Sequence, residues 1–353
     1  MERVSRRDFF RLSGIAGAMG LVHWIRPASS PLGIVSLAHA SGSQLTFAYV
    51  SDSHLLVRKG YDKEHRFTRA LKKAVTDVNS MSPQPEFVLF GGDLAQLGLK
   101  EELDLGKGIL SELKPKLYMM VGEHDWYHDM GEAWKGLFGE DRYSFDRKGI
   151  HFVVLNSVIV EDYWTGSKMT PMERMLFMAQ LDNPRGNPFT VGPEGREWLK
   201  SDLAKVSKDT PVVVFSHSPL YKYYKRWNFW TDDAAEVQAL LSPFANVTVI
   251  HGHTHQALVN RIGSITFYGM LSTAWPWPYA PEGLPELTRQ MDRADPFNQF
   301  DGCGWGEAAF SQQGEADKVY NLWDREPMAV FYKDVKAGAI PGQPDRLHSG
   351  SSY

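Results

Sequence analysis

Acidic and imidazole side chains gather in five short motifs of this sequence, each directly after an apolar run. The motifs are, in chain order, Asp52-Ser53-His54, Gly91-Gly92-Asp93, Gly122-Glu123-His124-Asp125, Ser216-His217 and Gly252-His253-Thr254-His255. Carboxylate and imidazole groups are ligands of Mn, Fe and Zn. A metal ion held by such groups lowers the pKa of a bound water molecule and so makes a nucleophile near neutral pH. These residue types therefore predict a metal site, and hydrolysis is a reaction that such a site supports.

Each motif taken alone is weak evidence. Aspartate and glycine are common in turns, so D-x-H and G-G-D by themselves fit ordinary polar turns better than a metal site. His253 and His255 are a stronger pair, because side chains two positions apart on an extended segment share a face. The order of all five motifs, each after an apolar strand, is what favours a common site.

The surrounding residues alternate between strand-like and helix-like patterns. The predicted strands are residues 45–52, 86–93, 116–125, 143–146, 151–157, 211–219, 246–255, 257–269 and 328–335, and the predicted helices are residues 64–80, 99–113, 192–206 and 232–242. This alternation is typical of an α/β fold with parallel strands, and the later strands without helices between them predict an antiparallel portion. Sites in such sheets form outside the carboxyl ends of the strands, where residues distant in sequence meet.

Two regions are too long to be plain connections. Residues 161–192 are rich in Met, Pro, Gly and Asn, and residues 274–325 are rich in Trp, Pro and Gly. Loops of this length are usually functional or disordered, and their aromatic content favours ordered covers. We therefore expect a single domain over residues 41–353, with cover-like insertions in these two places.

The ordered motifs resemble those of the calcineurin-like metallophosphoesterases, whose pattern is D-x-H, G-D, G-N-H-[DE], a lone His and G-H-x-H. The matching positions are Asp52-Ser53-His54, Gly92-Asp93, Gly122-Glu123-His124-Asp125, His217 and Gly252-His253-Thr254-His255. The resemblance implies a four-layer α/β sandwich of two packed mixed β-sheets flanked by helices, with the metal site at the C-terminal edge of the strands. It also implies hydrolysis of a phosphodiester or phosphomonoester by a hydroxide that bridges two metal ions.

The resemblance further implies a role for each site residue. The implied ligands are Asp52, His54 and His255 for the first ion, Asp93 as the bridge, and Glu123, His217 and His253 for the second ion. His124 would assist the leaving group or stabilise charge on the phosphoryl group. Asp125 is placed to orient and charge that imidazole, or alternatively to cap the following helical segment. The implied cofactors are two divalent or trivalent transition metal ions, namely Fe, Mn or Zn.

Glu123 is where the sequence departs from the family pattern, which has a neutral Asn at this position. Extra negative charge lowers the Lewis acidity of a metal ion and favours a harder or more highly charged one. Glu123 either ligates the second ion, turns away and leaves that site weak, or marks a chain that has lost phosphoesterase chemistry. The third case gives an alternative function, a non-catalytic periplasmic metal-binding or assembly protein on the same fold.

The first forty residues predict a cleaved export signal. Arg6-Arg7 follow Ser5 and precede the run GIAGAMGLV, and the segment ends in A-H-A at Ala40. These parts in this order are typical of a twin-arginine signal peptide, here cleaved after Ala40. The alternative is an amphipathic N-terminal helix of the folded domain. The signal implies the twin-arginine translocation machinery as a partner and a periplasmic or secreted location.

Composition narrows the choice of partners. Removing residues 1–40 takes five basic and two acidic residues from totals of 38 and 42, which leaves 33 and 40 and a net charge of −7. That sign does not favour nucleic acid or an anionic membrane as the main partner. No later stretch has about 18 unbroken apolar residues, so we expect no stable membrane span. Cys303 is the only cysteine, so we expect no internal disulfide.

Two aromatic segments lie where a wall of the site is expected. Residues 221–230, YKYYKRWNFW, include Lys222, Lys225 and Arg226, and residues 275–279 read WPWPY. Such rings and cations stack on a base, enclose a quaternary amine or bind a sugar, so nucleotide, lipid-headgroup and sugar phosphates are all open as the small-molecule substrate. Alternatively, the rings pack the covers onto the core. Monoester and diester substrates are equally open.

Overall fold

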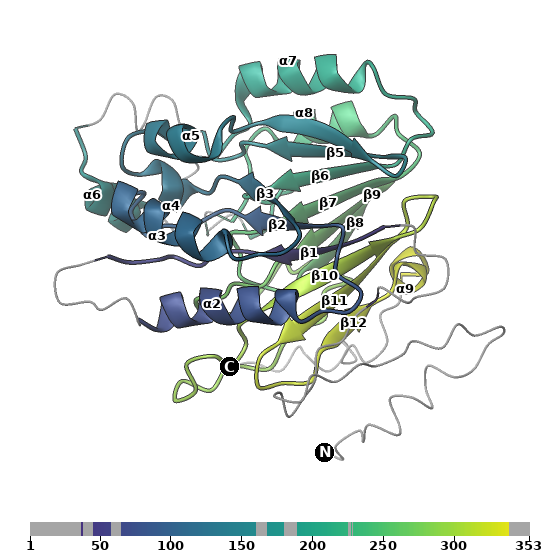
Figure 1. The fold of residues 1–353 in the computed structure, drawn as a ribbon. Coiled ribbons are helices and arrows are strands. Elements are labelled where there is room, and N and C mark those ends of the chain that lie inside the picture. Colours follow the sequence, from purple (N-terminus) through teal and green to yellow (C-terminus); the bar gives the residue numbers. More distant parts are fainter. Residues whose placement is uncertain are drawn as a thin grey trace.

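Two packed β-sheets form the centre of the protein. The computed structural model describes residues 37, 45–57, 65–159, 168–179, 189–224, 227 and 229–338. Within this part of the chain, the strands form two six-stranded mixed sheets that face each other, and helices flank them (Figure 1). The prediction of an α/β sandwich of two mixed sheets flanked by helices is confirmed.

The first sheet has the strand order β12-β11-β10-β1-β2-β3. Its strands are β1 Leu45–Val50, β2 Phe87–Gly91, β3 Lys116–Met120, β10 Gly304–Phe310, β11 Ala316–Leu322 and β12 Met328–Val330. β1, β2 and β3 run parallel and are joined by the helices α2 (Arg66–Asn79) and α3 (Lys100–Leu110). β10, β11 and β12 extend the sheet in antiparallel order. The carboxyl ends of β1, β2 and β3 therefore share one edge.

The second sheet has the strand order β4-β5-β6-β7-β9-β8. Its strands are β4 Tyr143–Arg147, β5 Ile150–Leu155, β6 Val212–Ser216, β7 Val247–His251, β8 Val259–Ile262 and β9 Ile265–Gly269. β5, β6, β7 and β9 run parallel, and β4 and β8 are antiparallel strands at the two edges. The helices α7 (Gly192–Leu203) and α8 (Ala234–Leu241) lie between β5 and β6 and between β6 and β7 in the chain. The carboxyl ends of β6 and β7 therefore also lie together.

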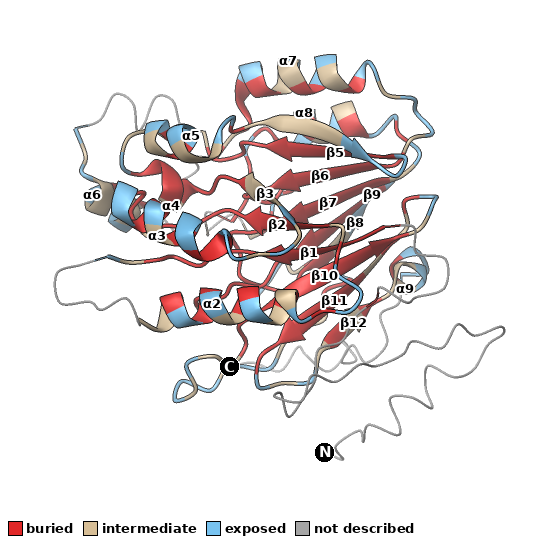
Figure 2. Cartoon of the chain, in the orientation of Figure 1, coloured by how far each residue is buried: buried red, intermediate tan, exposed pale blue. Residues whose placement is uncertain are grey.

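Strand residues alternate between the two faces of each sheet, as the two-residue period of a strand requires. In β1, Phe47 and Tyr49 point between the sheets, whereas Ala48 and Val50 pack toward the helices. Phe152 of the second sheet meets Phe47 edge to face, with ring centroids 6.1 Å apart. Figure 2 shows most strands buried and the helices striped with buried and exposed residues, while β3, β4 and β8 are partly exposed. The apolar side chains between the sheets, such as Phe47 and Phe152, hold the two sheets in one arrangement.

The helices bury one face each. The apolar stripe of α2 packs on the outer face of the first sheet and consists of Ala70, Leu71, Ala74, Val75 and Val78. Asp77 of α2 also accepts hydrogen bonds from the indole N–H groups of Trp305 and Trp323, at 3.3 and 2.9 Å. α7 and α8 pack on the second sheet. The remaining helices are α4 Glu123–Trp126, α5 Glu132–Phe138, α6 Pro171–Met178 and α9 Tyr332–Lys336.

Two predictions about the C-terminal part of the chain are wrong in part. Residues 304–322, inside the predicted insertion at 274–325, form β10 and β11 and complete the first sheet. The sequence of β10, GWGEAAF, does not have a strand pattern because it contains two glycines. Gly306 is required there, since the hydroxyl end of Tyr49 leaves no room for a side chain. The last predicted strand ends at Val330, and α9 follows it.

Some predictions fall on residues outside the described part of the chain. They are the export signal, apart from Leu37, and half of the predicted insertion at 161–192, namely residues 161–167 and 180–188 on either side of α6. Leu37 is buried against Ala309 and Val319, and its N–H donates to Glu307 at 2.9 Å. Among the residues that are described, no helix has the length and apolar character needed to cross a membrane.

Candidate metal centre

The five sequence motifs lie at one edge of the sandwich. Asp52, Asp93 and Glu123 follow β1, β2 and β3 of the first sheet, whereas His217 and His253 follow β6 and β7 of the second. All seven predicted ligand residues are buried, and the structure brings them into two adjoining groups. The site therefore depends on both sheets.

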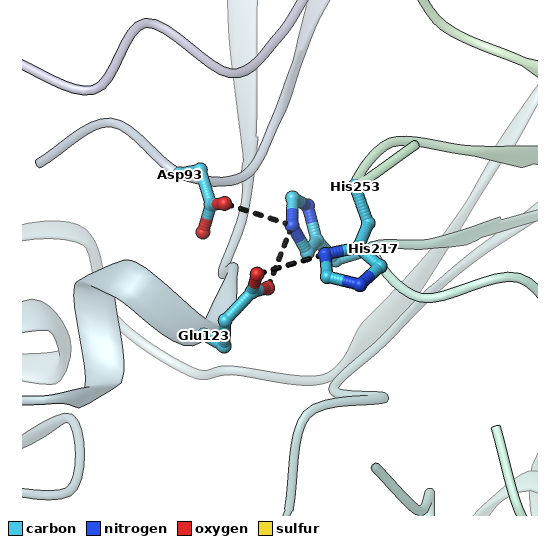
Figure 3. Close-up of side chains that lie close together, drawn as sticks. All are labelled: Asp93, Glu123, His217 and His253. Carbon is cyan, nitrogen blue, oxygen red and sulfur yellow. Dashed lines mark ion pairs between the residues drawn. The ribbon is translucent and has the colours of Figure 1, made fainter. Parts of the chain in front are cut away.

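Four residues form what we call the second group: Asp93, Glu123, His217 and His253 (Figure 3). The Nε2 atom of His217 lies 2.9 Å from Oε2 of Glu123 and 3.2 Å from Oδ2 of Asp93. The Nδ1 atom of His253 lies 2.8 Å from Oε1 of Glu123. The carboxylate of Glu123 therefore points into the group and does not turn away from it. One donor atom from each of the four residues lies within 4.8 Å of the others, which suits donors around one cation.

Three residues form the first group: Asp52, His54 and His255. The Nε2 atom of His255 lies 3.1 Å from Oδ1 of Asp52 and 3.1 Å from Nε2 of His54. Burial, followed by the neighbouring imidazoles of His124 and His255, lowers the pKa of His54 well below its ordinary value. The imidazole of His54 is therefore neutral at physiological pH, which is the form that ligates a metal ion.

Asp93 lies between the two groups. Its Oδ2 atom is 3.2 Å from Nε2 of His217 and 3.7 Å from Nε2 of His54. Its Oδ1 atom accepts a hydrogen bond of 3.0 Å from the backbone N–H of His124. One carboxylate oxygen thus faces a ligand-type nitrogen on each side, which is the arrangement that a shared ligand requires.

The donor atoms of the second group fit a bound cation. Oε2 of Glu123 and Nε2 of His217 are buried and have no hydrogen-bond partner, although they lie 2.9 Å apart. A buried polar atom without a partner costs about 1–3 kcal/mol. A cation that accepts both lone pairs would remove that cost. Because the predicted ligands offer only nitrogen and oxygen, the donors suit Mn, Fe or Zn.

Charges within the second group support one another. Burial raises the pKa of Glu123, but His253 and His217 outweigh it and hold that pKa well below its ordinary value. Burial lowers the pKa of His217, but Asp93 and Glu123 outweigh it and raise that pKa well above its ordinary value. When no metal ion is bound, the imidazole of His217 is therefore protonated, and its positive charge balances the negative charge of the Asp93 and Glu123 carboxylates.

Hydrogen bonds donated to main-chain carbonyls orient two of the candidate ligands. The Nδ1 atom of His217 lies 2.7 Å from the carbonyl oxygen of Gly91, and that of His255 lies 2.7 Å from the carbonyl oxygen of Trp275. A carbonyl accepts only from an N–H group, so Nδ1 carries the proton and Nε2 is left to ligate. Such outer partners fix the ring direction of metal-binding histidines.

Five of the seven candidate ligands have a left-handed backbone conformation. The φ angles are 53° at Asp52, 47° at His54, 53° at Asp93, 64° at His253 and 49° at His255. Positive φ is uncommon outside glycine, and it costs of order 1–3 kcal/mol at a residue with a side chain. The strand ends are therefore bent so that consecutive motif residues aim at the site.

His124 is oriented by the loop after β2. Its Nδ1 atom lies 2.7 Å from the carbonyl oxygen of Gln96, and its ring meets that of His54 edge to face at 4.5 Å. The side chain of Gln96 also contacts His54, with Oε1 2.9 Å from Nδ1. Gln96 therefore positions two imidazoles, one through its main chain and one through its side chain.

The predicted contact of Asp125 with His124 is wrong. The two oxygens of Asp125 accept hydrogen bonds from the backbone N–H groups of Ala95, at 2.9 Å, and Gly122, at 3.1 Å. Asp125 therefore ties the first turn of α4 to the loop after β2. Burial and then the nearby Asp93 raise the pKa of Asp125 well above its ordinary value. The alternative prediction, a helix cap, was nearer to this role.

Sequence reasoning missed two residues that contact the candidate ligands, and it predicted a third, Trp275, only as part of an aromatic wall. The missed residues are Ser51, whose hydroxyl donates to the Asp52 carboxylate, and Gln96. Ser51 and Gln96 lie within three residues of a motif, so proximity to the motifs was the available signal. Trp275 lies twenty residues after His255, and no motif indicates its contact with that ligand.

The comparisons with known proteins agree with this geometry. The family profile of the calcineurin-like phosphoesterases matches residues 45–257, which is more than half of the chain and spans all five motifs. The chain is similar to a 3′,5′-cyclic-nucleotide phosphodiesterase of Nostoc, with 21% identity over 239 residues that cover 65% of this chain and 79% of that protein. It is also similar to a "probable glycerophosphodiester phosphodiesterase" of Arcobacter nitrofigilis, with 28% identity over 177 residues that cover 49% and 56% of the two chains.

A solved structure supports the fold independently. A dimetal phosphatase of Danio rerio has a TM-score of 0.55 and 13% identity, and the match covers 82% of this chain and 99% of that one. The likeness concerns the arrangement of the sheets and helices. With the family profile over both donor groups, it leads to one conclusion: the chain belongs to the calcineurin-like phosphoesterase family and is a metal-dependent phosphoesterase.

Proposed function

We propose that this phosphoesterase hydrolyses phosphodiesters at a centre of two metal ions. The observation that carries the proposal is the position of Asp93, whose Oδ2 atom faces His217 on one side and His54 on the other. Two donor groups that share one carboxylate suit a pair of ions about 3.5–4 Å apart. Both sequence relatives are named as phosphodiesterases, which favours a diester over a monoester.

The proposed ligands follow the two groups. They are Asp52, His54 and His255 for the first ion, Asp93 for both, and Glu123, His217 and His253 for the second. The ions would neutralise charge on the phosphoryl oxygens and activate water for attack. The chain itself supplies donors whose directions are fixed before substrate binds, and such preorganised groups need no rearrangement during the reaction.

His124 is the proposed proton donor to the leaving group. It is only partly buried, whereas the seven proposed ligands are buried. With Nδ1 held by the Gln96 carbonyl, Nε2 is the nitrogen that would meet the substrate. A histidine suits this task because its ordinary pKa lies near neutral pH.

Glu123 is the proposed carboxylate ligand of the second ion. Its two oxygens lie 2.9 and 2.8 Å from His217 and His253, which supports ligation over a rotamer that faces solvent. Its negative charge would favour a ferric or manganese ion at this position. That choice of ion is part of the proposal.

Export by the twin-arginine route is the proposed path to the periplasm or the medium. It rests on Arg6-Arg7 and the A-H-A sequence that ends at Ala40. Cleavage after Ala40 would remove Leu37 and its hydrogen bond to Glu307. N-terminal sequencing of the exported protein tests this. The expected result is a mature chain that begins at Ser41. Export should be lost when Arg6-Arg7 is changed to Lys-Lys. An N-terminus that retains Leu37 would exclude the proposed cleavage.

Metal analysis and a substrate pair test the catalytic proposal. Protein purified from its export compartment should contain two metal ions per chain. After loading with Mn or Fe, it should hydrolyse bis-(p-nitrophenyl) phosphate faster than p-nitrophenyl phosphate. A faster monoester reaction would overturn the diester assignment. Metal binding without turnover of either ester, or of a wider phosphoester panel, would favour a metal-binding or assembly role.

A further inference from the structure

Aromatic rings border the candidate metal centre from the first group to the second. The ring centroid of Trp275 lies 4.2 Å from that of His54 in the first group. Trp277 follows, with its ring 6.3 Å from that of Trp275 and nearly perpendicular to it, at 81°. Phe229 lies 6.1 Å from Trp277 and 5.1 Å from His253 of the second group. The rings thus form a continuous series alongside both groups.

These rings differ in how they are packed. Phe229 is buried in the apolar cluster that the second sheet forms with α7 and α8, and the partly exposed Trp277 packs against the same cluster. Trp275 is partly exposed as well. Trp275 belongs to none of the apolar clusters found among the described residues. Its ring neighbours are Phe67, at 5.4 Å, Trp277 and the imidazoles of the first group. Core packing therefore explains Phe229 and leaves Trp275 unexplained.

The main chain at Trp275 is fixed by the site itself. Its carbonyl oxygen lies 2.7 Å from Nδ1 of His255, and its N–H donates to the hydroxyl of Ser272 at 3.2 Å. That hydroxyl donates in turn to the main chain of the first motif at 2.8 Å. From α2, Arg66 donates to the carbonyl of Ala274 at 3.0 Å. An indole on so firmly held a segment needs little ordering when a ligand stacks on it.

Arg66 and Lys222, two described cations near these rings, already have partners. Arg66 donates to the carbonyls of Gln299 and Ala274 and lies over the ring of Phe67 at 4.7 Å. Lys222, the described cation of the aromatic segment 221–230, lies 3.7 Å from Asp232 and over the ring of Trp230 at 4.8 Å. Lys225 and Arg226 lie outside the described residues. What the described structure offers beside the metal groups is flat apolar surface.

We propose that Trp275 and Trp277 form a specificity subsite for a planar aromatic substituent on the phosphoester, either a nucleobase or an aryl group. The inference rests on the proposed phosphodiesterase function and names its substrate class. A planar ring stacks on an indole and covers its exposed face, whereas a small polyol such as glycerol has no flat apolar face to offer. The subsite therefore selects aromatic diesters over small aliphatic ones.

Three diesters with the same ring-free leaving group, 2,2,2-trifluoroethanolate, test the subsite through turnover. Their second substituent is methyl, benzyl or the 5′-carbon of thymidine. The metal-loaded protein should cleave the benzyl or thymidine ester with a kcat/KM about tenfold above that of the methyl ester, since one stacked pair is worth about that factor. A preference for the thymidine ester alone assigns the subsite to a nucleobase, and a preference shared by both esters assigns it to any planar ring. No preference over the methyl ester would overturn the proposal.

Variants of the indoles locate the preference. Trp275→Leu should reduce the aromatic-to-methyl ratio of kcat/KM about tenfold, and Trp275→Phe should keep most of it. The control is Trp198→Leu, a partly buried indole on α7, which should keep the wild-type ratio. If Trp275→Leu loses metal or fails to fold, Trp277→Leu is the second variant. The ring of Trp277 is 6.2 Å from that of His255, so it also borders the site. An unchanged ratio in a folded, metal-loaded Trp275→Leu protein, or in Trp277→Leu when the first variant is unusable, contradicts the proposal.

Binding provides a readout that does not need turnover. Calorimetry on the metal-loaded protein should show phenylphosphonate binding about tenfold more tightly than methylphosphonate, and Trp275→Leu should remove the difference. Equal affinities in the wild-type protein would exclude the subsite even if diesters are hydrolysed. Conversely, selective binding of phenylphosphonate by a protein that hydrolyses no phosphoester would remove the proposed function and leave the subsite standing.

Discussion

The two donor groups share one edge of the sandwich but differ in the protonation of their histidines. With Asp93 facing both sides, each group offers two carboxylates and two imidazoles. The pKa of His54 in the first group lies well below its ordinary value, while that of His217 in the second lies well above it. The second group therefore attracts positive charge more strongly than the first. We expect the two ions to differ in charge or in how tightly they are held.

One histidine of the first group is oriented by a side chain. His54 contacts the side chain of Gln96, whereas His255 and His217 contact the main-chain carbonyls of Trp275 and Gly91. A side-chain partner can be removed by one substitution, but a carbonyl cannot. The first group is therefore the one whose outer support can be tested directly by mutation.

Asp93→Asn should have the largest effect, because this carboxylate faces both groups. We expect lower metal content at both sites and a fall in kcat of at least about 10²–10³-fold, the usual cost of removing one key electrostatic group. Metal analysis and the diester assay measure both quantities. Asp104→Asn, an exposed carboxylate on α3, is the control and should leave both unchanged. Loss of one ion with full retention of the other would show that Asp93 is not shared.

Glu123→Asn separates the two groups. Since only the second group loses a charge, we expect its ion to bind about 10–100-fold more weakly, with less ferric iron retained, and the first ion to stay bound. Titration of the metal-free protein with Fe or Mn, followed by the diester assay, measures the change. Unchanged metal content together with an unchanged rate would mean that Glu123 does not ligate.

Gln96→Leu weakens the first group alone. His54 loses its outer partner, while the carbonyl of residue 96 still orients His124. Loss of such a partner typically costs about 10–100-fold in metal affinity or activity. Gln238→Leu, a partly buried glutamine on α8, is the matched control. Equal weakening of both ions would refute the assignment of Gln96 to one group.

Lys318→Met should have the smallest effect of these substitutions. Because Lys318 joins the two sheets, its replacement changes the stability of the fold that carries both groups and not one group alone. Lys318 lies on β11, its Nζ donates to the carbonyl of Gly269 on β9 at 3.1 Å, and the ring of Tyr49 is 4.3 Å away. Burial lowers the pKa of Lys318 well below its ordinary value. The unfolded chain therefore binds more protons up to about pH 10.4, so wild-type stability should rise with pH toward that value.

Lys318→Met should remove this pH dependence and raise the melting temperature at pH 7 by about 2–4 °C, since an apolar side chain needs no desolvation of charge. Thermal unfolding of both proteins at pH 7 and 9.5, followed by circular dichroism, measures it. The gap between the two proteins should narrow at the higher pH. A constant gap would show that Lys318 does not titrate on unfolding.

The sheets and the helices that join their parallel strands were predictable because the pattern repeats. Apolar runs such as residues 86–93 and 211–219 carry no other signal than a buried strand, and they form β2 and β6. β10 was not predictable, because its glycines break the strand pattern, and the reason for Gly306, the close hydroxyl end of Tyr49, lies on a neighbouring strand. Its place in the first sheet is a tertiary effect that no local pattern contains.

The candidate site shows the same limit. The motifs predicted which residues meet, because the ends of parallel strands share an edge, and the seven candidate ligands do lie in two adjoining groups. The hydrogen-bond partner of His124 could not be predicted. Asp125 and the Gln96 carbonyl are both possible acceptors, and because every residue has a carbonyl, the sequence does not single out Gln96. The contact of Trp275 with His255 depends on how the chain returns from β9, which spacing alone does not determine.

The left-handed conformation of five candidate ligands has a consequence for how the motifs change. Few residue types tolerate these torsions: Gly readily, and Asn, Asp and His more often than others. Asp52→Asn removes a charge and keeps the path of the chain, whereas Asp52→Val changes the path itself. The motif letters thus meet a torsional demand as well as a chemical one. In a related protein that no longer binds ions, we expect Asn and Gly to replace Asp and His at these positions while the path of the main chain is kept.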